Sequence, residues 1–168
     1  RAGPQALRVA CKLKPAFTHP DYIWRPETGH WGRKNAMTRN GQRLLMLIDD
    51  EPAQRRLVAA IAARRGWRTI FAGEGETAIA TLGTPDGMSL DAVILDRSSP
   101  DFDASALITE LRLRRPALPI LMLTANGSVA TAVGSMRAGA TDFLVKPIAS
   151  ERLLAALEAA VGGKAAGE

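Results

Sequence analysis

Four short apolar runs in this chain each end at a polar side chain. The runs cover residues 44–48, 92–95, 119–123 and 143–145. The polar residues that follow them are the pair Asp49 and Asp50, then Asp96, Thr124 and Lys146. Strands that are apolar throughout are typical of a parallel sheet covered on both faces. Since the carboxyl ends of parallel strands meet at one edge, where open α/β sheets hold their ligands, these side chains are predicted to converge.

Strands and helices alternate from Leu44 onward. The predicted strands cover residues 44–48, 67–72, 91–95, 120–123 and 142–145, and the predicted helices cover 52–66, 77–82, 105–113, 128–137 and 148–161. Pro52 suits a first helical turn with Asp50 or Glu51 as the N-cap acceptor, and Gly139 suits a left-handed C-cap. Right-handed crossovers then favour an α/β, flavodoxin-like fold: a doubly wound five-stranded parallel sheet in the order 2-1-3-4-5, with helices on both faces.

The net charge of +5 is concentrated at the start of the chain. Residues 1–40 hold eight Lys and Arg against two acidic residues, whereas residues 41–168 hold 14 basic and 15 acidic ones. Prolines and glycines interrupt this basic tail, which has no strand or helix period, so we expect it not to fold alone. Either Met37 is the true start and the upstream stretch is not native, or the tail is a docking arm.

The predicted organisation is therefore a disordered or non-native tail over 1–40, one globular domain over 41–162 and the start of a linker over 163–168. No helix-turn-helix pattern supports direct nucleic-acid binding by this chain. No apolar run approaches the roughly 20 residues of a membrane helix, and the N-terminus lacks a signal-peptide core, so we expect a cytoplasmic protein without a membrane anchor. Cys11 is the only cysteine, which excludes an internal disulfide.

The predicted edge gathers three carboxylates and a lysine. Such carboxylates repel at neutral pH unless a cation joins them, and oxygen ligands favour a hard divalent ion such as Mg²⁺. Protonated Lys146 cannot bind a metal, so its place beside the acids indicates that an anion enters the cluster. A phosphoryl group on Asp96, the predicted nucleophile, fits because Mg²⁺, Lys146 and the Thr124 hydroxyl would take its oxygens. Each residue alone has a structural explanation; their order at successive strand ends favours a site.

The motifs at these strand ends resemble the receiver domain of bacterial two-component response regulators. In one-letter code they are LIDDEP at 47–52, ILD at 94–96, SP at 99–100, LTA at 123–125, GATDF at 139–143 and VKP at 145–147. The match covers about residues 43–161, and several elements in the family's order are more specific than any one. The resemblance implies a signalling domain, not an enzyme, that receives a phosphoryl group from a sensor histidine kinase or a histidine phosphotransfer protein.

The resemblance also implies which residues hold the phosphoryl group and the metal. Asp96 aligns with the phosphoacceptor, and Asp50 aligns with the direct ligand of Mg²⁺. Asp49 aligns with the acid that holds the metal through water. The backbone carbonyl of Ser98 aligns with a further metal ligand.

A second group of residues is implied to sense the phosphoryl group. Lys146 aligns with the phosphate-binding lysine, and in the family its bond to the following proline is often cis. Thr124 and Phe143 align with the hydroxyl and the aromatic residue that rearrange together on phosphorylation. The expected result is a change on the face formed by the fourth helix, fifth strand and fifth helix, which promotes a homodimer.

Residues 124–140 carry a finer resemblance. They are similar to receivers of the nitrogen-regulatory class of sigma-54-dependent transcription activators, in which an ATPase and a DNA-binding domain follow. Neither domain follows here. The final residues would suit a truncation within the linker, or the chain would be a free-standing phosphorelay receiver.

Three residues depart from the family pattern. Arg97, Ser99 and Ala104 stand where an apolar residue, a methionine and a glycine are usual. Arg97 raises the alternative of a receiver-like module that binds proteins without being phosphorylated, because a cation beside Asp96 could replace the role of the lysine. A phosphatase of the haloacid dehalogenase kind would need a second acid two positions after the nucleophile, where this chain has Ser98.

Overall fold

The computed structural model describes residues 22–25, 30–33, 42–97, 103–125 and 127–162. The chain divides into two compact units, residues 1–37 and 38–168. In the first unit, strands β1 (Tyr22–Arg25) and β2 (His30–Arg33) pair antiparallel, with Trp24 opposite Trp31. These strands lie in the tail for which the sequence shows no strand period. Met37 and residues 163–168, on which the predicted boundaries depend, lie outside the described residues.

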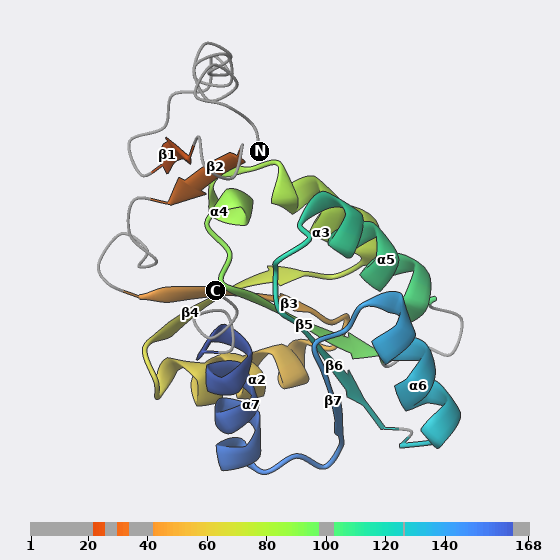
Figure 1. The fold of residues 1–168 in the computed structure, drawn as a ribbon. Coiled ribbons are helices and arrows are strands. Elements are labelled where there is room, and N and C mark those ends of the chain that lie inside the picture. The colour runs from red at the N-terminus through yellow and green to blue at the C-terminus, as the bar shows by residue number, and fades with distance from the viewer. Residues whose placement is uncertain (1–21, 26–29, 34–41, 98–102, 126, 163–168) are drawn as a thin grey trace. The chain divides into compact units, whose positions relative to one another are not determined.

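The second unit is built on a parallel sheet of five strands (Figure 1). The strands are β3 (Arg43–Ile48), β4 (Trp67–Ala72), β5 (Ala92–Arg97), β6 (Ile120–Thr124) and β7 (Asp142–Val145). Their order is β4-β3-β5-β6-β7, which places the second strand of this unit at one edge and the last at the other. The predicted flavodoxin-like order is confirmed.

Helices follow every strand of this sheet. They are α2 (Pro52–Ala63), α3 (Gly75–Leu82), α4 (Pro85–Met88), α5 (Ala104–Arg114), α6 (Val129–Ala138) and α7 (Ser150–Gly162). The short helix α4 was not predicted; it begins at the Thr84 cap, whose hydroxyl accepts a hydrogen bond from Gly87 N. No described helix is long and apolar enough to cross a membrane.

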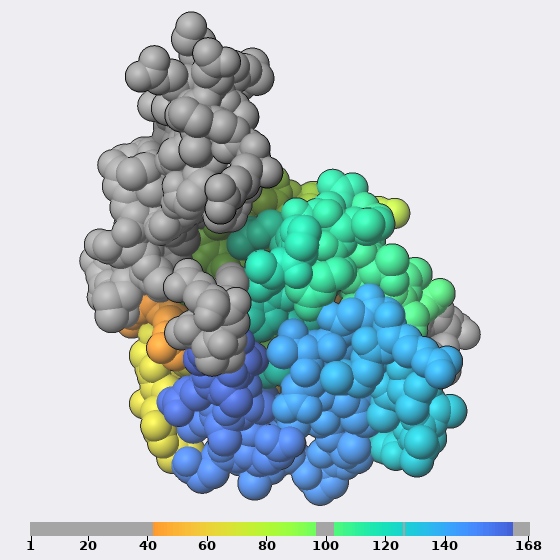
Figure 2. All heavy atoms as spheres, in the orientation of Figure 1, coloured from red at the N-terminus to blue at the C-terminus, as the bar shows by residue number. Residues whose placement is uncertain are grey.

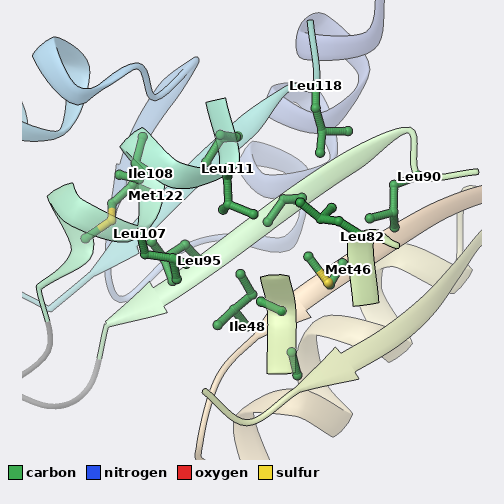
Figure 3. Close-up of a cluster of buried hydrophobic side chains, with 14 of the residues drawn as sticks. Met46, Ile48, Leu82, Leu90, Leu95, Leu107, Ile108, Leu111, Leu118 and Met122 are labelled. Carbon is green, nitrogen blue, oxygen red and sulfur yellow. The ribbon is translucent and has the colours of Figure 1, made fainter. Parts of the chain in front are cut away.

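The two faces of the sheet bury separate apolar clusters. Figure 1 shows α2 and α7 together on one face and α3 and α5 on the other. Along β3, Met46 and Ile48 belong to the α3–α5 cluster, whereas Leu45 and Leu47 belong to the α2–α7 cluster. Figure 3 shows the first cluster, where α5 packs on the central strands. Each buried Leu or Ile stabilises the fold by about 1.5–3 kcal/mol relative to exposure, so both faces hold the strands in place.

The ends of two helices test the predicted caps. Pro52 occupies the first turn of α2, as predicted, and Glu51 stands at its N-cap, but no side-chain hydrogen bond caps the helix. Instead, the Glu51 backbone N–H donates to Asp49 Oδ1 at 2.8 Å. Gly139 ends α6 with φ of 116°, the left-handed conformation predicted for it and one that glycine adopts without strain.

Candidate functional site

The register of the sheet lines up the predicted site residues across four strands. Ile48 of β3 pairs with Leu95 of β5, so the next residues, Asp49 and Asp96, are neighbours at the carboxyl edge. On the other side, β5 pairs with β6 and β6 with β7, where Thr124 stands opposite Val145. Lys146 follows Val145 directly. The predicted convergence at one edge is therefore observed for these residues.

Strand alternation divides the site residues between the two faces of the sheet. Leu47, Ile94 and Leu144 belong to the α2–α7 cluster. Because side chains two residues apart share a face, Asp49, Asp96 and Lys146 follow on this side. Met122 belongs to the other cluster, and Phe143 packs against it. Thr124, two residues after Met122, follows on the side of Phe143 by the same alternation.

Asp96 is buried, with 5% of its surface exposed. Its Oδ2 lies 2.5 Å from Lys146 Nζ and forms an ion pair with it. Its Oδ1 is also buried and has no hydrogen-bond partner. Burial raises the pKa of Asp96 above its ordinary value; Lys146 opposes this effect, and the nearby charge of Asp49 adds to it. The carboxylate is thus held in a buried position beside a cation and a second acid.

Asp49 is buried even more completely, with 1% of its surface exposed. Its Oδ1 accepts the Glu51 N–H, whereas its Oδ2 is buried without a hydrogen-bond partner. Burial raises the pKa of Asp49, while the Glu51 N–H and then Lys146 act to lower it. Leaving a buried acceptor unsatisfied costs about 1–3 kcal/mol, and more for a charged group. Asp49 and Asp96 together therefore present unsatisfied oxygens that suit a cation.

The other predicted metal ligands are placed differently. The Asp50 side chain is exposed. Among the residues that the structure describes, no three acidic, histidine or cysteine side chains form a ready-made metal site. Ser98 lies outside the described residues. The structure thus brings together two of the three predicted carboxylates, with the third at the exposed rim.

The predicted switch residues lie on neighbouring strands. Thr124 is buried, and its backbone carbonyl accepts a hydrogen bond from Lys146 N at 2.8 Å. Phe143 is half-buried. The Lys146–Pro147 peptide bond is cis, as the family resemblance led us to expect. The backbone therefore joins the β6 end, which carries the hydroxyl, to the lysine of the acidic cluster.

One residue of this edge was missed from the sequence. Arg55, the fourth residue of α2, donates from Nε to the backbone carbonyl of Asp49 at 2.6 Å. The available signal was its position: long side chains on a helix lean toward the N-terminus, so a cation in the first turn reaches back over the acidic loop.

Comparison with known proteins identifies the family. Residues 45–158 match the response regulator receiver domain. The transcriptional regulatory protein ZraR of Salmonella typhimurium is 32% identical over 117 residues, which are 70% of this chain and 26% of ZraR. The chain spans about half or less of the length of the curated relatives it matches.

Two solved structures have the same fold. NtrX from Brucella abortus, solved in complex with ADP, superposes with a TM-score of 0.65 and 31% identity, over 74% of this chain and 27% of NtrX. Together with ZraR, it agrees with the expected resemblance to the nitrogen-regulatory class. The receiver domain of the sensor histidine kinase PA1611 from Pseudomonas aeruginosa, 24% identical, superposes with a TM-score of 0.62 over 72% of this chain and 98% of that domain. That structure has a magnesium ion in its active site cleft. From the family match and these folds, the chain belongs to the response regulator receiver domain family.

Proposed function

We propose that this domain accepts a phosphoryl group on Asp96 from the phosphohistidine of a sensor histidine kinase or a histidine phosphotransfer protein. The observation that carries the proposal is the buried pair of carboxylates, Asp49 and Asp96, with Lys146 in contact with one Asp96 oxygen. A deprotonated Asp96 oxygen would attack phosphorus as the phosphorus–nitrogen bond breaks. The bonding pair leaves with the imidazole, and an acyl phosphate forms.

The acids at this edge fit a bound Mg²⁺. Asp49, Asp50 and Asp96 would hold it, with the Ser98 carbonyl as a further ligand implied by the family. The unsatisfied Asp49 Oδ2 and Asp96 Oδ1 support this assignment, and the PA1611 receiver domain offers a precedent. The ion would neutralise charge that builds on the phosphoryl oxygens. Lys146 would bind the same oxygens from the other side, because its ammonium already faces Asp96.

Phosphorylation would act on the face made of α6, β7 and α7. The strand β7 contacts both α6 and α7, and the light-blue to dark-blue segments that contain these elements lie side by side in Figure 2. Val129, Val133 and Met136, spaced along one side of α6, are exposed, as is Val145 on β7. We infer that rearrangement of Thr124 and Phe143 reshapes this apolar face and promotes a homodimer, by which the domain would control a sigma-54-type activator.

Phosphoryl analogues test the proposal. Beryllofluoride or acetyl phosphate with Mg²⁺ should shift the amide NMR signals of the residues next to Asp96 and Lys146, and then those of α6 and β7. Asp96→Asn should abolish incorporation of labelled phosphate. Glu110→Gln, on the exposed side of α5, serves as the control and should label normally. An unmoved spectrum, or label on the Asp96→Asn protein, would contradict the proposal.

A second candidate is a receiver that binds partners without being phosphorylated. It is favoured by one observation: the described residues hold no ready-made group of three acids, and Asp96 is already paired with Lys146. Mg²⁺ titration separates the two candidates, since binding in the millimolar range or tighter supports phosphoryl transfer. The phosphatase alternative gains no support, because the family that the chain matches is a signalling domain.

A further inference from the structure

Arg55 connects the acidic loop to the first turn of α2. Its Nε–H donates to the Asp49 carbonyl at 2.6 Å, and its backbone N–H donates to the Glu51 carbonyl at 3.1 Å. We propose that Arg55 is a positioning residue that fixes the loop between β3 and α2 for cation binding, and that Gly73 keeps the space its guanidinium occupies. This inference rests on the proposed function.

The loop is held at three points. Asp49 N donates to the Ala72 carbonyl at 3.0 Å, which extends the pairing of β3 with β4 by one residue. Asp49 Oδ1 accepts the Glu51 N–H, which turns the chain toward α2. Arg55 then holds the Asp49 carbonyl from the helix side. With the backbone and Oδ1 committed, only Oδ2 of the Asp49 carboxylate stays available to a ligand.

Arg55 acts on the backbone of Asp49 and not as a counterion of its carboxylate. The charges that act on that carboxylate are those of Lys146, Asp50 and Glu51, and its raised pKa comes mainly from burial. A hydrogen bond from a charged donor to a carbonyl is stronger than a neutral one, and outer partners of this kind orient the groups that hold a metal. Loss of Arg55 would therefore loosen the position of Asp49 and Asp50 without removing a metal ligand.

Gly73, which directly follows β4, offers a second position at which the contact of Arg55 with Asp49 can be disturbed. A Cβ at this position would lie 3.0 Å from Arg55 Nη2, and it would meet no other described atom within 4 Å. The backbone of Gly73 lies outside the left-handed region, so a side chain there causes no strain of its own. The Cβ of a residue at position 73 should therefore act by displacing the guanidinium.

Variants at both positions test the inference by two measurements. The first is the Mg²⁺ dissociation constant from calorimetry, and the second is amide hydrogen exchange at Glu51 without metal. Arg55→Ala should weaken Mg²⁺ binding about tenfold, as loss of other outer-shell partners does, and should speed exchange at Glu51. Arg55→Lys should recover part of the affinity, since an ammonium can make one of the contacts. Arg56→Ala, at the exposed neighbouring arginine, is the matched control and should change neither value.

A double-mutant cycle decides the role of Gly73. Gly73→Val should weaken Mg²⁺ binding in the wild-type background and have no further effect in Arg55→Ala. Equal effects in both backgrounds, or wild-type affinity and Glu51 exchange in folded Arg55→Ala, would overturn the inference. If the Arg55→Ala protein does not fold, Mg²⁺ affinity and Glu51 exchange in Arg55→Lys and Gly73→Val test the inference instead. A wild-type chain that takes no Mg²⁺ would instead overturn the proposed function, and with it the cation-binding role of Arg55.

Discussion

At the amino edge of the sheet, polar groups of neighbouring segments satisfy one another. Leu44 N donates to Asp91 Oδ2 at 2.8 Å while Asp91 N donates to the Leu44 carbonyl. Ile120 and Thr141 are linked in the same reciprocal way, through the Thr141 hydroxyl. The buried groups without a partner in the amino-terminal half of β4, among the described residues, are the neutral Trp67 Nε1 and Thr69 Oγ1.

At the carboxyl edge, the groups without hydrogen-bond partners are charged. Among the described residues, Asp49 Oδ2 and Asp96 Oδ1 are buried without a partner, whereas Asp96 Oδ2 pairs with the ammonium of Lys146. Buried polar groups in folded proteins are usually satisfied, so an exception that involves two acids lowers the stability of the fold and agrees with the proposed binding site. The same sheet thus has an edge whose polar groups pair with one another and an edge that keeps buried carboxylates, where we propose that a ligand binds.

The substitution with the largest expected effect on the free energy of unfolding lies at the amino edge. Arg112 of α5 donates to the carbonyls of Pro116, Leu118 and Gly139, and burial lowers its pKa. Arg112→Ala leaves these acceptors without their donor, so we expect the free energy of unfolding to fall by about 3 kcal/mol. Urea denaturation measures the change.

The control for this substitution lies on the same helix. Arg114 makes an exposed pair with Glu110 at 2.7 Å, and Arg114→Ala should cost only about 0.3–0.5 kcal/mol. Mg²⁺ affinity should stay the same in both variants, because neither residue lies at the carboxyl edge. A loss of Mg²⁺ binding in Arg112→Ala would show that the two edges are not independent.

The next effect is the response of the carboxyl edge to Mg²⁺. A ligand at a hundredfold excess over its dissociation constant stabilises a fold by about 2.7 kcal/mol, and Mg²⁺ should do so at neutral pH. Because burial raises the pKa values of Asp49 and Asp96, protons compete with the metal at a pH above the ordinary value of 3.8. Melting temperatures with and without Mg²⁺ should therefore converge in mildly acidic buffer. A Mg²⁺ effect that persists unchanged there would contradict the placement of the ion at these acids.

Much of the contrast between the amino and carboxyl edges of the sheet could be predicted from the sequence. The apolar runs and the polar residues that end them indicated the strands, their parallel order and the edge where Asp96 and Lys146 meet. The short helix α4 was missed because four residues are too few to show a helical period, and the strands β1 and β2 were missed for the same reason. The contact of Arg55 with Asp49 and the unsatisfied carboxylate oxygens depend on side-chain geometry in the folded state, which no pattern of residue types reports.

An Asp→Asn substitution should change the free energy of unfolding in opposite directions at the two edges. Asp96→Asn should raise the free energy of unfolding by about 1 kcal/mol at neutral pH, because burial disfavours the charged form. Asp91→Asn should lower it by about 1 kcal/mol, since a neutral amide accepts the Leu44 N–H less strongly than a carboxylate.

The stability of the folded domain should depend on pH through Asp96. Its folded-state pKa is raised, so the folded state binds more protons than the unfolded state, and stability falls as the pH rises from 3.8 through the raised value. Asp96→Asn should flatten this part of the stability curve. Denaturation of both proteins across this pH range, without metal, measures it; destabilisation by Asp96→Asn at neutral pH would mean that the Lys146 pair outweighs burial.

The smallest expected effect isolates a single neutral bond at the amino edge. Thr141→Val removes the hydroxyl that accepts the Ile120 N–H at 3.1 Å but keeps the branched shape that suits the start of β7. Because Thr141 is itself exposed, water can partly replace the bond, and we expect a loss of about 0.5 kcal/mol. Hydrogen exchange at the Ile120 amide should quicken, whereas the signals of Asp49, Asp96 and Lys146 should not move. Since Ile120 and Thr124 lie at opposite ends of β6, a change that reached the carboxyl edge would show that this strand transmits disturbances along its length, and the two edges would then have to be treated as one coupled system.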